Sequence, residues 1–487
     1  MKKLLFLLLF ILVNTFSVKV QGRISNFYLD NGMRVLLLED HSQPQIYGAV
    51  VVHVGSKNDP VDNTGMAHYL EHLMFKGTDK IGTLDWEKET VHLDSITTLY
   101  DILHKTKDET RRKELQMHIN RLSNAAAQYA IPNEIDEILS NMGSENVNAF
   151  TNYDVTVYHN KFPSNQLEKW LTVYAERFRY PVFRLFQTEL EAVYEEYNLN
   201  QDYPNMAFYN DFLTTAFSNH PYGRDIIGYP SHLKNPQLSA MQEFFCKYYH
   251  PNNMTLVLVG DFQESEIQQL LPNTMGKIHN DLANDSVINN VQRMNTRINQ
   301  VIEPLKEKYI KTVKETSNKM GVLSYQIPGT DHKESIYLEL LSKLLNNESN
   351  TGILDKIGNS QIILAAESKV KQNLESGLFT IFYAPKAVGQ SFEEAERYIL
   401  SSVDSLCKGK FSDNLFQAVK MEYLRKYVTD KETLSGNFNI VLGLAVKEIP
   451  IDDYEQRENI VRGITKNDLV SIANKYLNNN YLILRSD

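Results

Sequence analysis

Two histidines and a glutamate lie close together in the segment His68-Tyr69-Leu70-Glu71-His72. On an α-helix, residues three and four positions apart project to the same side, so His68, Glu71 and His72 would share one face. Two neutral imidazoles one turn apart can hold a zinc ion, and a carboxylate is a common third ligand. Glu71 beside such an ion could accept a proton from a water whose pKa the metal lowers. The spacing therefore predicts a metal centre with a general base.

The same polar residues also fit an ordinary amphipathic helix. In that interpretation they face water, and the residues that face the core are Met66, Tyr69, Leu70 and Leu73. Both interpretations expect a helix from about Thr64 to Lys76, because Asp62 and Asn63 can cap its start and Gly77 fits its end. The presence of a metal is what distinguishes them.

The segments around this helix follow strand and helix patterns in turn. An Asn31-Gly32 pair between two apolar runs predicts a hairpin over 24–38, and residues 45–55 continue as a strand. Residues 84–130 are strongly charged and carry apolar residues at helical spacing, which predicts a helical hairpin. Strand patterns return at 148–152 and 155–158.

A weak internal repeat indicates two related domains. Residues 247–261 and 475–487 both run from a helix end through an Asn-rich turn into a final strand, at an offset of 475 − 247 = 228 residues. A chain of 487 residues also exceeds one hydrophobic core. We therefore expect an α+β fold of two related domains, each a mainly antiparallel sheet with helices packed on one face. The expected bounds are 23–262 for the first domain, 263–306 for a polar linker and 307–487 for the second domain.

The N-terminus and the composition indicate location and exclude some partners. Lys2 and Lys3 precede the apolar run Leu4–Val13 and then a polar stretch, which is the order of a secretory signal peptide over residues 1–22. An uncleaved anchor is the alternative, although the run is too short to favour a membrane span. The net charge of −10 argues against a nucleic-acid partner. We expect a secreted protein without stable membrane insertion.

A longer pattern surrounds the two histidines. They lie within Met66–Thr78, which follows the predicted strand that ends at Gly55. Other segments of the same pattern are Asp30–Val35, Asn148–Thr151, Tyr222–Arg224, Tyr249–Asn253 and Val259–Asp261. Together they resemble the pitrilysin, insulin-degrading enzyme and mitochondrial processing peptidase family, whose H-x-x-E-H motif is that of the inverzincins. The resemblance covers about 24–262 and extends more weakly to 487, and it implies a zinc metallopeptidase of the periplasm or the cell exterior.

The resemblance implies a third zinc ligand on a later helix. Glu189 and Glu196 match two family glutamates seven residues apart, of which the second binds zinc. We expect Glu196 to complete the site of His68 and His72 with one zinc per chain, and Glu195 is its main competitor. Glu189 is expected to be a catalytic or supporting carboxylate, and a solvated acidic helix face is the plain alternative.

The spacing between the ligands departs from the family. Glu196 follows His72 by 196 − 72 = 124 residues, which is longer than the family usually shows. An insertion at 84–130 would account for the excess and leave both ligand helices intact. The insertion is either a surface ornament or a device that limits substrate access or docks a partner.

The resemblance also implies a mechanism and a mode of substrate binding. Glu71 is expected to take a proton from the zinc-activated water and to pass it to the leaving amine. A peptide or unfolded polypeptide would add as a strand to the sheet edge at Asn148, Ala149 and Phe150, so sequence preference should be loose. An ordinary sheet edge is the alternative for these residues.

The resemblance also bears on the residues that would grip the substrate. Family members often carry an Arg and a Tyr in a second half that grip the substrate, and neither occurs in the matching residues 345–356 and 363–366. We therefore expect a second peptidase-like half, supplied as a homodimer, as a heterodimer or from a longer chain. The alternatives are a non-catalytic or partner-dependent subunit and a zinc hydrolase of another bond.

Overall fold

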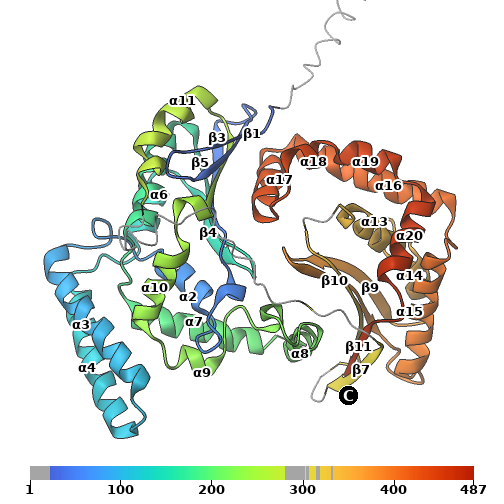
Figure 1. Cartoon of the computed structure of the whole chain (residues 1–487), viewed down its shortest axis with the longest axis horizontal. Coiled ribbons are helices and arrows are strands. Elements are labelled where there is room, and N and C mark those ends of the chain that lie inside the picture. The colour runs from blue at the N-terminus through green and yellow to red at the C-terminus, as the bar shows by residue number, and fades with distance from the viewer. Residues whose placement is uncertain are drawn as a thin grey trace, which may run out of the picture.

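The chain folds into two halves of similar architecture that face each other (Figure 1). The structure is a computed structural model, and it describes residues 22–203, 205–279, 302, 307–313, 318–330 and 333–486. The predicted signal peptide, residues 1–22, lies outside the described residues except for Gly22. Among the helices of the described ranges, none is both long and apolar enough to cross a membrane.

The sheet of the first half has six strands in the order β1-β2-β6-β3-β5-β4. Neighbouring strands are antiparallel except β2 and β6, which run parallel. Gly32 closes the β1–β2 hairpin with a φ of 87°, a conformation that glycine adopts without steric cost. β4 is an edge strand that pairs with β5 alone. The strands are β1 (Ser25–Tyr28), β2 (Arg34–Glu39), β3 (Gln45–Val52), β4 (Glu145–Thr151), β5 (Thr156–Pro163) and β6 (Met254–Gly260).

Helices of the first half pack on one face of this sheet. Alternate strand residues such as Val50 and Leu256 point into a core that also contains Leu70, Trp170 and Phe245 from the helices. The helices are α2 (Met66–Leu73), α3 (Trp86–Lys105), α4 (Glu109–Ala127), α5 (Glu134–Asn141), α6 (Leu167–Arg179), α7 (Phe186–Gln201), α8 (Met206–Ala216), α9 (Pro230–Leu233), α10 (Leu238–Tyr248) and α11 (Glu264–Leu270).

The second half repeats this plan with a five-stranded sheet in the order β7-β11-β8-β10-β9. Its one parallel pair, β7 with β11, lies where β2 and β6 lie in the first sheet. Its strands are β7 (Tyr309–Val313), β8 (Gly321–Pro328), β9 (Ala365–Gln372), β10 (Ser376–Ala384) and β11 (Leu482–Ser486). Its helices are α13 (Ser335–Leu345), α14 (Ile353–Asn359), α15 (Phe392–Cys407), α16 (Asp413–Thr429), α17 (Leu434–Val446), α18 (Ile451–Glu455), α19 (Arg457–Gly463) and α20 (Lys466–Tyr476).

The internal repeat seen in the sequence is a structural repeat. β11 begins 482 − 254 = 228 residues after β6, and α20 begins 466 − 238 = 228 residues after α10. The same offset relates α8 to α17, and α7 to α16 within one residue at the helix start. The α+β prediction of two related, mainly antiparallel domains is confirmed.

Each half covers the outer face of the other half's sheet with one helix. Phe438 and Val441 of α17 pack against Val51 and Val257 of the first sheet. Reciprocally, Phe212 of α8 packs in a cluster with strand residues of the second sheet that include Val322, Leu378 and Leu484. The central strands of the two sheets are therefore buried on both faces, and this exchange of helices fixes the halves against each other.

A buried polar network joins the halves beside this packing. Lys57 has no exposed side-chain surface, and its ammonium lies 2.8 Å from Asp154 and 2.7 Å from Glu375 of the second half. Asp154 also accepts from the backbone N–H of Leu374, and Tyr222 donates to Asp154. Because these charges are paired and hydrogen-bonded, their burial holds one orientation of the two halves.

One segment departs from the expected domain bounds, and a second contains the helical hairpin that the sequence predicts. Residues 263–279 were expected to belong to a linker, but they contain α11 and two short 3-10 turns whose residues Ile267, Leu271 and Met275 enter the first core. The first half therefore extends to residue 279, because regular apolar spacing persists within this polar stretch. Residues 84–130 contain the helical hairpin α3–α4, which projects away from the second half (Figure 1).

Candidate metal centre

Backbone contacts to Asp59 and Gly65 fix the start of the helix that carries the two histidines. The Asp59 carboxylate accepts from the N–H groups of Gly65 (2.8 Å) and Ala67 (2.9 Å), which satisfies donors that the first turn of α2 leaves free. Gly65 has a φ of 86°, and a Cβ there would lie 2.3 Å from the carbonyl oxygen of Ile227. Leu70 and Leu73 of α2 are fully buried and pack into the core of the first half.

The helix that carries Glu189 and Glu196, α7, lies against α2. Val193 is buried on its inner face, and the Tyr69 hydroxyl of α2 donates to the carbonyl oxygen of Phe186 (2.6 Å) at its start. Glu189 and Glu196 are two turns apart and both point toward α2, where they contact its histidines.

Three side chains from these helices converge on one point. The Glu196 Oε2 atom lies 3.6 Å from His68 Nε2 and 3.5 Å from His72 Nε2. Ligand atoms of the three residues all lie within 4.8 Å of one another. Within the ranges that the structure describes, no other group of three or more His, Cys, Asp or Glu side chains is so arranged. Glu195, the competing candidate, is exposed and is not part of the cluster.

Glu189 contacts the other side of His72. Its Oε2 lies 3.6 Å from His72 Nδ1, and its Oε1 lies 2.6 Å from the Lys76 ammonium. A carboxylate on Nδ1 favours the tautomer in which Nε2 is free to bind a metal. Glu189 therefore contacts a residue of the three-residue cluster without belonging to it.

The charges of the site are set by burial and by these contacts. Burial and the neighbouring His72 lower the pKa of His68 to about 4. Burial favours neutral His72, but the carboxylates of Glu189 and Glu196 outweigh it and raise the pKa of His72 to about 9. His72 lowers the pKa of Glu196 below its usual range. At neutral pH the cluster thus holds one neutral imidazole, one imidazolium and one carboxylate.

The proposed general base lies beside the cluster and next to the sheet edge. Glu71 is 8% exposed, and the Thr151 hydroxyl at the end of β4 donates to its Oε2 (2.6 Å). Burial raises the pKa of Glu71. On β4, Asn148 and Phe150 are exposed and Ala149 is half-buried, on an edge strand whose outer backbone groups have no partner strand. The edge and the carboxylate are therefore adjacent.

This donor set fits a zinc ion. Two imidazole nitrogens and one carboxylate oxygen are a ligand set of catalytic zinc sites, which leave a position open. Removing the His72 proton frees its Nε2, and Glu189 then accepts from Nδ1–H. Cys246 and Cys407 lie in different halves, form no disulfide and lie outside the cluster.

Comparison with known proteins identifies the family of the chain. A family model described as Insulinase (Peptidase family M16) matches residues 34–105 and 118–229, and one described as Peptidase M16 inactive domain matches 237–423. Together they cover more than half of the chain. The chain belongs to peptidase family M16. The unmatched residues 106–117 of this M16 protein fall at the turn of the α3–α4 hairpin and the start of α4.

Curated relatives of this M16 chain carry zinc-protease names. Zinc protease PqqE of Helicobacter pylori is 23% identical over 461 residues, which are 92% of this chain and 89% of PqqE. Probable zinc protease PqqL of Escherichia coli is 24% identical over 261 residues, which are 51% of this chain and only 23% of PqqL.

Solved structures share the fold at low sequence identity. A protease from Helicobacter pylori has a TM-score of 0.77 at 20% identity, and covers 96% of this chain and 100% of its own. The periplasmic protease PqqL from Escherichia coli has a TM-score of 0.71 at 17% identity over 96% of this chain. Pitrilysin has a TM-score of 0.67 at 18% identity over 97% of this chain. The match covers 48% of that PqqL chain and 45% of that pitrilysin chain, so this M16 chain spans about half of each.

Sequence reasoning missed contacts that the fold supplies. Thr151 was seen only as part of a strand, and its bond to Glu71 joins residues 80 positions apart. Lys76 follows His72 by four residues, and in the helix predicted over 64–76 this spacing would have marked it as a partner of the site. Asp59 precedes α2 by too many residues to look like a cap.

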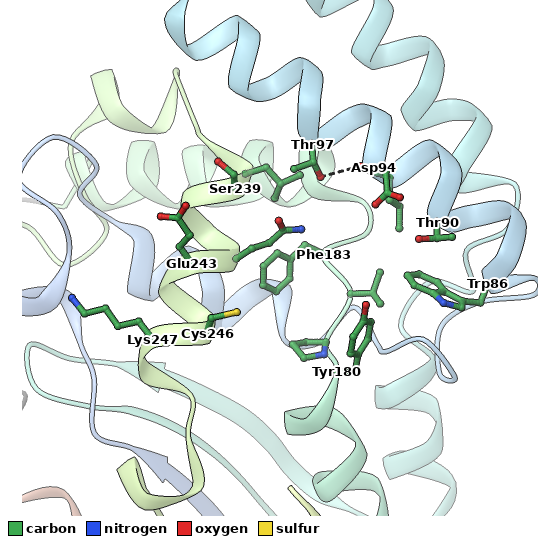
Figure 2. Close-up of a pocket in the computed structure, with 15 residues that line it drawn as sticks. Trp86, Thr90, Asp94, Thr97, Tyr180, Phe183, Ser239, Glu243, Cys246 and Lys247 are labelled. Carbon is green, nitrogen blue, oxygen red and sulfur yellow. Dashed lines mark hydrogen bonds between the residues drawn. The ribbon is translucent and has the colours of Figure 1, made fainter. Parts of the chain in front are cut away.

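A cleft elsewhere in the first half contains none of these residues. It has a volume of about 630 Å3 and lies between α3 and α10, with Trp86 and Tyr180 at one end and Lys247 at the other (Figure 2). Its lining mixes apolar side chains with exposed polar ones. The cleft therefore does not belong to the candidate metal centre.

Proposed function

We propose that this M16 chain is a secreted zinc metalloendopeptidase that hydrolyses peptide bonds in peptides or unfolded polypeptides. The observation that carries the proposal is the convergence of His68 Nε2, His72 Nε2 and Glu196 Oε2 beside the buried carboxylate of Glu71. Zinc-protease names among the relatives support the metal and the peptide bond as target.

His68, His72 and Glu196 would hold the zinc, with Glu189 supporting His72. When bound, zinc supplies Lewis acidity, which polarises a carbonyl group and lowers the pKa of water. Glu71 would accept the proton of the attacking water and return it to the leaving amine. Its burial, which raises its pKa, suits a carboxylate that must hold that proton between the two steps. The Thr151 hydroxyl keeps one Glu71 oxygen engaged and thus orients the carboxylate.

Substrate would bind as an added strand on β4. Asn148, Ala149 and Phe150 occupy its exposed edge, and Thr151 at its end contacts Glu71. An extended peptide bonded to this edge would run past the general base. Main-chain hydrogen bonds dominate such binding, so we expect broad sequence tolerance.

The proposal includes a second peptidase-like half. This chain matches about half of the PqqL and pitrilysin structures, and one solved structure is described as the first half of the periplasmic protease PqqL. A second copy of this chain or a related chain would supply the missing half. The periplasm or the cell exterior fits the N-terminal pattern and the periplasmic PqqL relative.

A peptide-cleavage assay tests the proposed function. Purified chain should cleave an unfolded polypeptide, lose activity with a chelator and recover it with zinc. The assay is run alone and with a co-expressed related chain, and sedimentation gives the oligomeric state. Cleavage only with the second chain supports a partner-dependent subunit. Absence of cleavage in both conditions, with zinc bound, contradicts the peptidase proposal and leaves a structural subunit or the hydrolysis of another bond.

A further inference from the structure

The α3–α4 hairpin packs against the elements that hold the metal centre. Its turn end points away from both the second half and β4 (Figure 1). Along its length α3 reaches the residues around the start of α7 through Glu89 and Tyr100. At the turn of the hairpin, Arg112 donates to Asn235 and His104 also contacts Asn235. The role of the hairpin is therefore to be sought in the side chains that it buries against the rest of the first half, and not in its charged outer surface.

The first of these contacts is a buried ion pair. Glu89 of α3 and Arg184, which precedes α7, are 0% and 1% exposed. Arg184 donates to both Glu89 oxygens, from Nε at 2.8 Å and from Nη2 at 3.1 Å. Such a pair is costly to bury unless every donor is satisfied. Here Nη1 also donates to the carbonyl oxygens of Lys76 (2.7 Å) and Ile81 (3.0 Å), and Nη2 donates to that of Thr78 (2.8 Å).

The loop after α2 is shaped around this guanidinium. Gly77 and Gly82 have φ values of 100° and 89°, and a Cβ at either position would lie 2.7 Å from Arg184 Nη1. Lys76 begins the loop, and its ammonium lies 2.6 Å from Glu189, which contacts His72. A continuous set of contacts therefore leads from Glu89 of the hairpin to a ligand of the metal centre.

A second contact reaches the first turn of α7. The Tyr100 hydroxyl donates to Gln187, and its ring lies 4.9 Å from that of Phe186. Leu185 precedes α7 in a left-handed conformation, with a φ of 55°, and offers no capping side chain. The start of α7 thus depends on its neighbours for support.

We propose that the α3–α4 hairpin is a brace that fixes α7 against α2 and so sets Glu189 and Glu196 relative to the two histidines. Glu89, Arg184 and Tyr100 are positioning residues in this role, which rests on the proposed zinc function. The hairpin would then be neither a surface ornament nor a device that limits substrate access. It acts on metal affinity and ligand geometry before any substrate binds.

Cobalt(II) binding to the metal-free full chain tests the brace. Titration gives the affinity, and the visible absorption of bound cobalt reports ligand geometry. Glu89→Gln should weaken cobalt binding about 10- to 100-fold, the range for residues that support metal ligands. Tyr100→Phe should weaken it about three- to five-fold, as expected for one lost hydrogen bond. Both variants should change the cobalt spectrum.

Matched substitutions in the same hairpin serve as controls. Glu87→Gln removes an exposed carboxylate two residues from Glu89, and Tyr129→Phe removes a hydroxyl just after the C-terminal end of α4. Both variants should bind cobalt as the wild type does. If Glu89→Gln does not fold, as judged by circular dichroism, Tyr100→Phe decides. A folded Tyr100→Phe or Glu89→Gln variant with wild-type affinity and spectrum overturns the brace alone. A wild-type chain that binds no cobalt overturns the proposed function and the brace with it.

Discussion

The two halves of this M16 chain share their architecture and differ in the side chains that can do chemistry. The 228-residue offset places Gln417 and Leu424 of α16 where α7 carries Glu189 and Glu196. Leu424 is buried in the second core, whereas Glu196 is part of the metal cluster. α13 follows β8 as α2 follows β3, and it contains no histidine. The comparison teaches that the packing plan survives in both halves while the candidate chemistry depends on a few residues of one.

Glu71→Gln should produce the largest change in activity. Peptide cleavage should fall at least about 100-fold, and up to about 10,000-fold, because a proton acceptor is lost while the shape of the side chain is kept. Zinc content should remain that of the wild type. Glu195→Gln, which changes an exposed glutamate of α7, is the control and should retain full activity. Retained turnover in zinc-loaded Glu71→Gln would contradict the assigned role.

Phe212→Ala and Phe438→Ala test the symmetric part of the comparison. Each removes a large buried side chain from a helix that covers the opposite sheet. Each should lower the free energy of unfolding by about 3–5 kcal/mol, measured by denaturant titration. Tyr398→Ala, at a partly exposed position, is a control that should cost far less. A large cost for one phenylalanine and almost none for the other would show that the exchanged helices are not equivalent.

Glu196→Gln and Gln417→Ala test the asymmetric part. Loss of a ligand should weaken zinc binding by more than about 100-fold, beyond the range for supporting residues. Gln417 occupies the equivalent helix without contacting a metal cluster, so its substitution should leave zinc affinity unchanged. Competition with a fluorescent chelator measures both affinities. Equal losses in the two variants would mean that zinc binding does not distinguish the halves.

Zinc binding at pH 7 should release about one proton. The pKa of His72, about 9, lies above that pH, so His72 is protonated and must lose a proton to bind zinc. The pKa of His68, about 4, lies below it, so His68 is already neutral. Affinity should therefore fall as the pH drops below 9, the pH at which His72 is half protonated, because a growing share of His72 must lose a proton to bind zinc. Calorimetry in two buffers of different protonation enthalpy counts the protons, and a count of zero would contradict this assignment.

The local features were predictable from the sequence because they depend on short spacings. The helix of His68 and His72, the Asn31-Gly32 hairpin and the 228-residue repeat all follow from patterns within a few turns or strands. Glu196 needed the family resemblance, since spacing alone cannot pair two helices 124 residues apart. Its role as a ligand stays a prediction.

Contacts between distant segments were not predictable in the same way. The bond of Thr151 to Glu71, the Glu89–Arg184 pair and the placement of α17 over the first sheet depend on how elements pack after they form. The polar composition of 263–279 concealed α11 because its few apolar residues, such as Ile267, lie among many polar ones. Composition describes the average of such a segment and not its buried face.

The zinc content of the purified chain tests the central claim most directly. The wild type and His72→Ala are each reconstituted with excess zinc and then desalted. Elemental analysis then gives the number of zinc ions per chain for each protein. We predict one zinc per wild-type chain and almost none in His72→Ala, because among the described residues only the first half brings two histidines and a glutamate together. No zinc in the wild type, or the same zinc content in both proteins, would contradict a metal centre built by α2 and α7.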